Sequence, residues 1–161
     1  MMESTISNRK DSTLTPLRRK IENQPFNANK LRKISAYYDI FSHEDCIMGE
    51  FEHDRYLGVH EIEGRFTYHP ATTDFLRLCR VDGWILVGFD WSGWSESDDA
   101  QTLLDDPDAL AEADPYDLAK VLTVIWGREH QKNGYIAEAY GNGLLLSVLH
   151  RAKTLSATAP F

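Results

Sequence analysis

Residues 84–94 read Trp-Ile-Leu-Val-Gly-Phe-Asp-Trp-Ser-Gly-Trp, and this stretch decides how the middle of the chain folds. Its first six residues, Trp84 to Phe89, form a nearly continuous apolar run, which is typical of a short strand buried on both faces. We therefore expect a central strand here, ending at Asp90 and leading into a turn. Trp84 is expected to lie in the core.

The residues before this stretch predict a helix, then extended chain, then a second helix. Apolar residues recur at helical spacing over 31–41, with Asn27 or Asn29 available as the N-cap. Residues 47–69 have the pattern of three extended segments. Proline at the first position and glycine just beyond the end mark a helix over 70–81.

The residues after this stretch are more clearly helical. The acid–proline pairs Asp106-Pro107 and Asp114-Pro115 both indicate helix starts, because the carboxylate caps free N–H groups and proline fits the first turn. The second pair opens a helix of about four turns that ends near Gly134. Two shorter helices follow over 135–140 and 144–153.

Length and charge define the domain organisation. With 161 residues and 42% hydrophobic content, the chain suits one domain. Residues 1–25 carry five basic and three acidic groups, whereas the remaining residues carry 12 basic and 22 acidic groups. The sequence predicts a flexible basic N-terminal arm over 1–25, a single domain over 26–155 and a loose tail over 156–161. The predicted fold class is α+β, small and mostly helical, with a short antiparallel sheet.

Several function classes are not expected from this composition. The negative charge of the domain repels phosphate backbones, so direct nucleic-acid binding by the folded part is not expected. The chain has no apolar run of the roughly 18 residues that span a bilayer, and no secretory pattern. Cys46 and Cys79 are isolated, which favours a reduced, cytoplasmic chain. No motif for a metal or a cofactor is present, so neither is expected.

An acidic run is the strongest functional signal. Residues 81–119 hold eleven carboxylates and no Lys or Arg, and three of the four tryptophans stand near its start. One interpretation is a solvated helical surface with good caps. The other is a surface that binds a basic partner protein, for which the candidate residues are Glu96, Asp98, Asp99, Asp105, Asp106, Asp108, Trp91 and Trp94. The two tryptophans can equally be core-edge packing.

Two short motifs stand out, one over residues 89–94 and one on the predicted helix between Thr123 and Gly134. They resemble motifs of an uncharacterised bacterial family known as domain of unknown function 6508. Phe89, Asp90, Trp91 and Trp94 reproduce its Phe-Asp-Trp-x-x-Trp motif. In its second, helical motif, Thr123 and Gly134 are retained and Arg128-Glu129 stands near the position of a charged pair, whereas His130 and Gln131 replace the Arg-Phe that follows. The similarity covers about residues 66–152. It implies a small α+β domain and, since the family has no assigned activity, no particular reaction.

The sequence therefore predicts a non-catalytic interaction protein. We expect an inhibitor or regulator whose acidic surface mimics nucleic acid and engages a basic, nucleic-acid-binding partner. The alternative is a small hydrolase or transferase that uses Asp90, Arg128, Glu129 and His130 for general acid–base chemistry. A structural interpretation of the same residues is that Asp90 caps a turn and pairs with Arg128.

Overall fold

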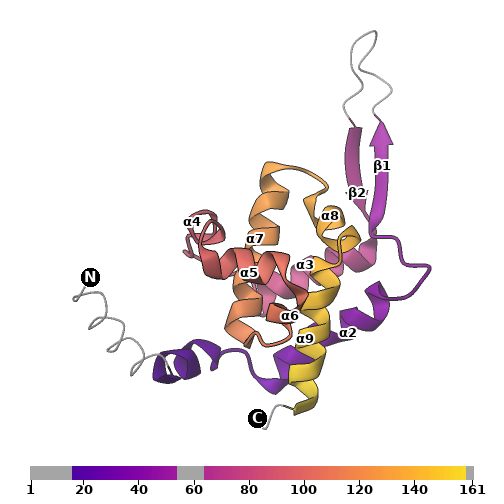
Figure 1. Cartoon of the computed structure of the whole chain (residues 1–161). Coiled ribbons are helices and arrows are strands. Elements are labelled where there is room, and N and C mark those ends of the chain that lie inside the picture. The colour runs from indigo at the N-terminus through magenta and orange to yellow at the C-terminus, as the bar shows by residue number, and fades with distance from the viewer. Residues whose placement is uncertain (1–15, 54–63, 159–161) are drawn as a thin grey trace.

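Helix α7 (Pro115–Gln131) is the central element of the fold. The structure is a computed structural model that describes residues 16–53 and 64–158. Nine residues of α7 are buried, and α4, α5, α8 and α9 all contact this helix. The other large interface joins α2 to α9, as Figure 1 shows. The core is therefore built mainly between helices.

Short helices and one hairpin complete the described chain. The elements are α2 (Ala28–Phe41), β1 (Gly49–His53), β2 (Gly64–Tyr68), α3 (Pro70–Val81), α4 (Trp91–Ser95), α5 (Asp98–Asp105), α6 (Pro107–Leu110), α7, α8 (Tyr135–Gly141) and α9 (Leu144–Thr158). This arrangement confirms the predicted α+β class, which is mostly helical with a short antiparallel sheet. Among the described helices, none is both long and apolar enough to cross a bilayer.

Local capping explains why most helices begin where the sequence predicts. The Asn27 side chain accepts a hydrogen bond from the Lys30 N–H and starts α2. Pro70 occupies the first turn of α3. At the start of α7, Asp114 and Asp117 form a capping box, in which each side chain accepts from the backbone N–H of the other. Each cap satisfies N–H groups that would otherwise lack a partner in the first turn.

The β1–β2 hairpin projects from the helical body (Figure 1). Its antiparallel register pairs Gly49 with Tyr68 and His53 with Gly64. Of the three segments predicted to be extended, the first and last contain these strands, and the middle one, over residues 56–62, lies outside the described residues. The Asn133 side chain lies against the free edge of β2, where it accepts from the Phe66 N–H and donates to the Phe66 carbonyl. The Asn133 side chain thus provides hydrogen-bond partners for two backbone groups at the edge of β2.

The predicted strand over residues 84–89 is wrong, because this segment is a loop. Trp84 is fully buried as expected, but Val87 is fully exposed. The backbone is satisfied without a neighbouring strand: the Trp84 N–H donates to the Cys79 carbonyl at 2.8 Å, and the Leu86 N–H donates to the Thr123 hydroxyl of α7 at 2.9 Å. Ile85, Leu86 and Phe89 are half-buried, and the first two pack against the hydrophobic core.

The two ends of the predicted domain differ in detail from the structure. Residues 16–23, which the sequence places in the N-terminal arm, are helical. The rest of that predicted arm, residues 1–15, lies outside the described part of the chain. At the other end, α9 continues to Thr158, so residues 156–158 are helical and not loose.

Candidate functional site

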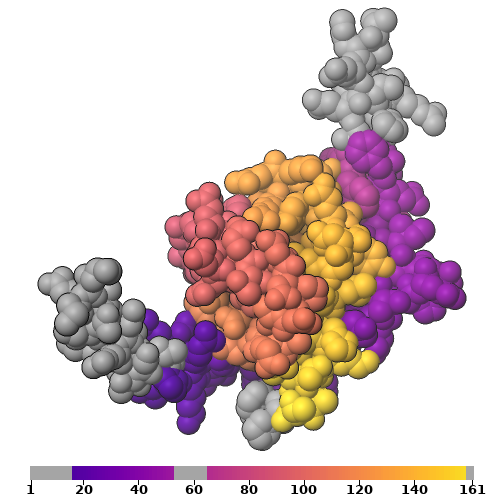
Figure 2. Space-filling view, viewed as in Figure 1, coloured from indigo at the N-terminus to yellow at the C-terminus, as the bar shows by residue number. Residues whose placement is uncertain are grey.

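Six carboxylates gather on three consecutive short helices, α4, α5 and α6. We call this surface the acidic face and define it by Glu96, Asp98, Asp99, Asp105, Asp106 and Asp108. All six residues are exposed. Figure 2 shows α4 and α5 as a continuous part of the surface that faces the viewer. The structure thus brings together the acidic residues that the sequence singles out.

No basic side chain within residues 16–53 and 64–158 forms an ion pair with the acidic face. Three other carboxylates of the acidic run do form ion pairs. Asp82 pairs with Lys33, Asp114 pairs with Arg19 at 2.5 Å, and Asp117 lies 3.4 Å from the Lys120 ammonium. Within the described chain, neutralisation therefore occurs on both sides of the acidic face and not on it.

Helix starts account for four members of the acidic face. Asp98 and Asp99 stand in the first turn of α5, whose N-cap is Ser97. Asp106 caps α6 by accepting from the Asp108 N–H at 2.9 Å. Carboxylates are stabilising at these positions, because the N-terminal end of a helix carries partial positive charge.

The remaining two members lie at junctions between consecutive helices. Glu96 is the C-cap of α4 and precedes Ser97, the N-cap of α5; Asp105 is the last residue of α5 and precedes Asp106, the N-cap of α6. The negative end of one helix and the positive end of the next therefore act on each carboxylate in opposite directions. Neither side chain makes a hydrogen bond or ion pair with another described residue. Helix capping therefore does not explain why acids occupy these two positions.

Neighbouring substitutions are expected to change stability by different amounts. Asp105→Ala removes an exposed carboxylate without a partner in the described chain and is expected to change the free energy of unfolding by less than about 0.5 kcal/mol. Asp106→Ala removes the α6 cap and is expected to lower it by about 0.5–2 kcal/mol. Urea denaturation of both variants measures the difference. A loss of stability for Asp105→Ala would show that this carboxylate supports the fold.

Trp91 and Trp94 join the acidic segment to α7 and are both half-buried. A methyl group placed on Gly127 would overlap the Trp91 ring at 2.2 Å, so this glycine allows α4 to approach α7 closely. The Trp94 ring lies 5.8 Å from the Phe89 ring and 5.2 Å from the Lys120 ammonium. Packing against the body thus accounts for much of both side chains, and a part of each remains exposed beside the acidic face.

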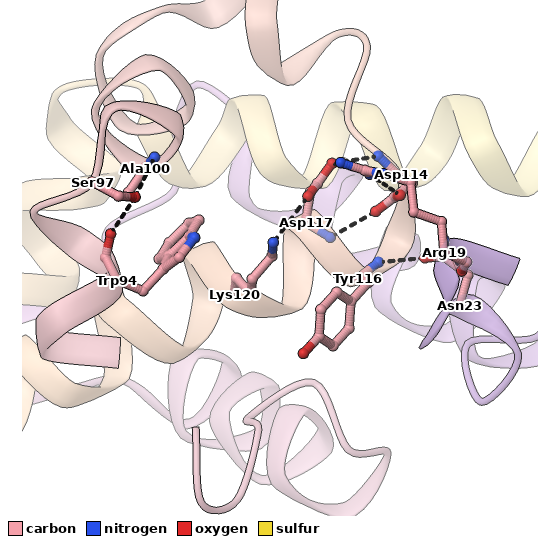
Figure 3. A network of polar contacts seen from close by, with 9 residues as sticks. All are labelled: Arg19, Asn23, Trp94, Ser97, Ala100, Asp114, Tyr116, Asp117 and Lys120. Carbon is pink, nitrogen blue, oxygen red and sulfur yellow. Dashed lines mark hydrogen bonds and ion pairs between the residues drawn. The ribbon is translucent and has the colours of Figure 1, made fainter. Parts of the chain in front are cut away.

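A polar network borders this region, and Figure 3 shows it from close by. Lys120 is only 17% exposed, lies between the Trp94 and Tyr116 rings, and is paired with Asp117. Its positive charge is therefore used internally. On the other side of the network, Arg19 pairs with Asp114, and the Asn23 side chain accepts from the Tyr116 N–H at 2.7 Å.

The electrostatics of Asp114 show that this network favours the charged carboxylate. Burial alone raises the pKa of the Asp114 carboxyl. Hydrogen bonds from the Asp117 N–H, Asn23 and Arg19, together with the charge of Arg19, outweigh burial and lower the pKa below its ordinary value. A lowered carboxyl pKa stabilises the fold above about pH 4, and this contribution is lost as the pH falls through the folded-state pKa.

The four residues of the enzyme alternative are engaged in separate contacts. Asp90 caps α4 by accepting from the Gly93 N–H at 3.0 Å, as its structural interpretation predicts. Arg128, however, donates to the Tyr135 hydroxyl at 2.8 Å instead of pairing with Asp90. His130 contacts the Trp126 carbonyl through Nδ1. Glu129 belongs to a fourth, distinct cluster.

Glu129 organises the turn between α7 and α8. Its carboxylate accepts from the Tyr68 hydroxyl at 2.5 Å and from the backbone N–H groups of Gly134 and Ile136. Burial, with the hydrogen bond to Glu129 as the next cause, raises the pKa of Tyr68. The sequence does not reveal the roles of Tyr68 and Asn133, because both contacts join segments more than 60 residues apart.

Metal ligands are not grouped in the described chain. Within residues 16–53 and 64–158, no three His, Cys, Asp or Glu side chains lie close enough together to hold a metal ion. Cys79 is buried and Cys46 half-buried, and both are free thiols.

The fold and the surface together define a small, mostly helical α+β protein with an unneutralised acidic face. The chain belongs to the family of unknown function DUF6508, whose model matches residues 26–158. This match confirms the resemblance seen in the Phe89–Trp94 and Thr123–Gly134 motifs and extends it to most of the chain. No curated protein and no solved structure matches.

The family motifs have a common structural role in this chain. Asp90 caps α4, Trp91 lies on Gly127, and Thr123 holds the 84–90 loop through Leu86. The motifs therefore fasten one loop and one short helix to α7, and the acidic face follows directly after that junction.

Proposed function

We propose that this protein is a non-catalytic interaction protein, an inhibitor or regulator whose acidic face binds a basic, nucleic-acid-binding surface on a partner protein. One observation carries the proposal: six exposed carboxylates on consecutive helices have no basic partner within the described chain. Two of them, Glu96 and Asp105, cap no helix with their side chains and make no hydrogen bond or ion pair with another described residue.

Carboxylates can replace phosphates for such a partner. Arg and Lys side chains that bind phosphate oxygens also form charge-assisted hydrogen bonds with carboxylates. The chain carries a formal net charge of −8, which steers a positively charged surface towards it over several ångströms in low salt. Association of this kind gains speed and specificity from complementary charge.

The chain contains its own example of a basic segment bound to the acidic run. Arg19, from the helix over residues 16–23, places its guanidinium 2.5 Å from Asp114 and 3.5 Å from Asp117. Asn23, from the same helix, accepts from the Tyr116 N–H. Carboxylates of this run thus bind a basic helix when one is adjacent, and we propose that a partner uses the unoccupied acidic face in the same way.

Neutralising the acidic face is expected to abolish partner capture. The test variant combines five isosteric changes that keep the Asp106 cap: Glu96→Gln, Asp98→Asn, Asp99→Asn, Asp105→Asn and Asp108→Asn. Each change removes a site for a partner cation, so the variant is expected to bind the captured partner about 10- to 100-fold more weakly. The measurement is affinity capture from the native host, followed by calorimetry with the purified partner in 50 and 300 mM salt.

A matched control variant removes the same charge elsewhere. It changes five exposed carboxylates outside the acidic face to their amides, namely Glu44, Asp45, Glu50, Glu52 and Asp74. This control variant is expected to retain most of the affinity for the partner. Raising the salt concentration is expected to weaken the binding of the wild type to the partner. Equal binding by the test variant and the wild type at low salt would contradict the proposal.

A further inference from the structure

Two adjoining cavities form a groove between α6 and α9 beside the acidic face. Their volumes are about 300 Å³ and about 500 Å³, and Pro107 and Ser147 line both of them. Since α6 and α9 are in contact, the groove follows the junction of these two helices, which lie side by side in Figure 1.

The larger cavity is mainly apolar, whereas polar and apolar groups line the smaller cavity in similar measure. Leu104, Leu110 and Leu144 line the smaller cavity, and Ala111 and Leu146 line the larger one. The combined size falls in the range of sites that enclose side chains or small ligands. An apolar side chain from another molecule would therefore be removed from water here.

The carboxylates lie at the smaller cavity and at the junction of the two cavities, and basic side chains line the larger cavity. Asp105 lines the smaller cavity, and Pro107 is flanked by Asp106 and Asp108, whose exposed carboxylates form no ion pair with a described residue. His150 and Arg151 line the larger cavity. Arg151 is fixed there, because its Nε donates to the Ala113 carbonyl at 2.8 Å.

This combination selects one kind of occupant. An amphipathic helix commonly binds by laying its apolar face into a groove between helices, with apolar anchors three or four residues apart. A cation beside such an anchor would lie next to Asp105, Asp106 and Asp108, whereas a cation in the larger cavity would meet Arg151. The groove is thus complementary to an apolar anchor with basic neighbours beside the smaller cavity.

We propose that the groove between α6 and α9 is the anchor site for a basic amphipathic helix of the partner protein. Leu or Ile side chains of that helix enter the groove, and its Lys or Arg side chains lie beside the carboxylates of the acidic face. This inference rests on the proposed function and deepens it, because it assigns the partner an apolar anchor in addition to its positive charge. A partner that bound through its positive charge alone would not need an apolar side chain in this groove.

Synthetic helical peptides test the anchor directly. The first probe carries Leu at positions i, i+4 and i+7 with Lys around them, and the second has Ser in place of each Leu. Fluorescence anisotropy in 50 mM salt is expected to show that the wild type binds the Leu/Lys peptide at least about tenfold more tightly than the Ser/Lys peptide.

A groove-filling variant provides the second readout. Ser147→Trp places a large ring between the two cavities, and Ala36→Trp, at an exposed position of α2, is the control. Ser147→Trp is expected to lower the affinity for the Leu/Lys peptide about tenfold and to leave the affinity for the Ser/Lys peptide unchanged. Ala36→Trp is expected to change neither. If Ser147→Trp does not fold, the two peptides on the wild type still decide the question.

The possible results separate the groove from the acidic face. If the wild type bound the two peptides with equal affinity and the five-site neutralised variant bound neither, the anchor site would be overturned. The proposed role of the acidic face would still be supported. No salt-dependent binding of either peptide would count against both. Chemical-shift changes at Leu104, Leu144 and Ser147 with the Leu/Lys peptide are expected, and changes confined to α3 and the β1–β2 hairpin would overturn the anchor site.

Discussion

Trp84→Ala is expected to lower the free energy of unfolding by about 3–5 kcal/mol, enough to unfold much of the chain at moderate temperature. Trp84 is fully buried and stacks on Phe26 with 4.6 Å between ring centroids. Its removal leaves a large cavity that close-packed neighbours fill only in part. Chemical denaturation followed by circular dichroism measures the loss.

Val87→Ala is the matched control for this prediction, because Val87 belongs to the same apolar run but is fully exposed. It is expected to change stability by less than about 0.5 kcal/mol. A loss above about 1 kcal/mol at Val87, comparable to Ile or Val truncation in a core, would instead support a buried strand over residues 84–89.

Glu129→Ala is expected to lower the free energy of unfolding by about 2–4 kcal/mol. The substitution leaves the Tyr68 hydroxyl and the Gly134 and Ile136 N–H groups without their acceptor. Half-buried donors that lose a charged acceptor incur a larger cost than an exposed pair does. Thermal unfolding of the variant, compared with the wild type, measures this cost.

Glu138→Ala is the control for Glu129, since Glu138 is an exposed carboxylate that pairs with Lys132 on the surface. A loss of only about 0–1 kcal/mol is expected there. If Glu129→Ala were as stable as the wild type, the carboxylate would be free of a structural role. The enzyme alternative, in which Glu129 takes part in acid–base chemistry, would then gain support.

Signals confined to a few neighbouring residues predicted the helices well. Asn27, Pro70, Asp106 and Asp114 mark helix starts in the sequence, and the structure confirms each one. Caps satisfy backbone groups within one turn, so their effect does not depend on how the rest of the chain packs.

Contacts between distant segments could not be predicted in this way. The run at 84–89 has the composition of a buried strand, but its backbone is satisfied by the Thr123 hydroxyl on α7, 37 residues away from Leu86. The cluster of Glu129, Tyr68 and Asn133 likewise joins β2 to the end of α7. Apolar composition shows that a segment is partly buried, and the available partner decides its conformation.

The acidic face could be predicted only in part from the sequence. Its carboxylates are evident in the sequence, but only the structure shows that Glu96 and Asp105 occupy helix ends and that the nearby Lys120 is already paired with Asp117. The sequence identified the charged residues, and tertiary packing determines which of them remain available.

Displacement of nucleic acid from the captured partner tests the role of the acidic face most directly. The purified partner is loaded with a fluorescent oligonucleotide, and the wild type, the five-site neutralised variant and the control variant are added in turn. We expect the wild type and the control variant to release the oligonucleotide, and the neutralised variant to leave it bound. Equal release by all three proteins, or binding of the wild type without release, would contradict the proposed role.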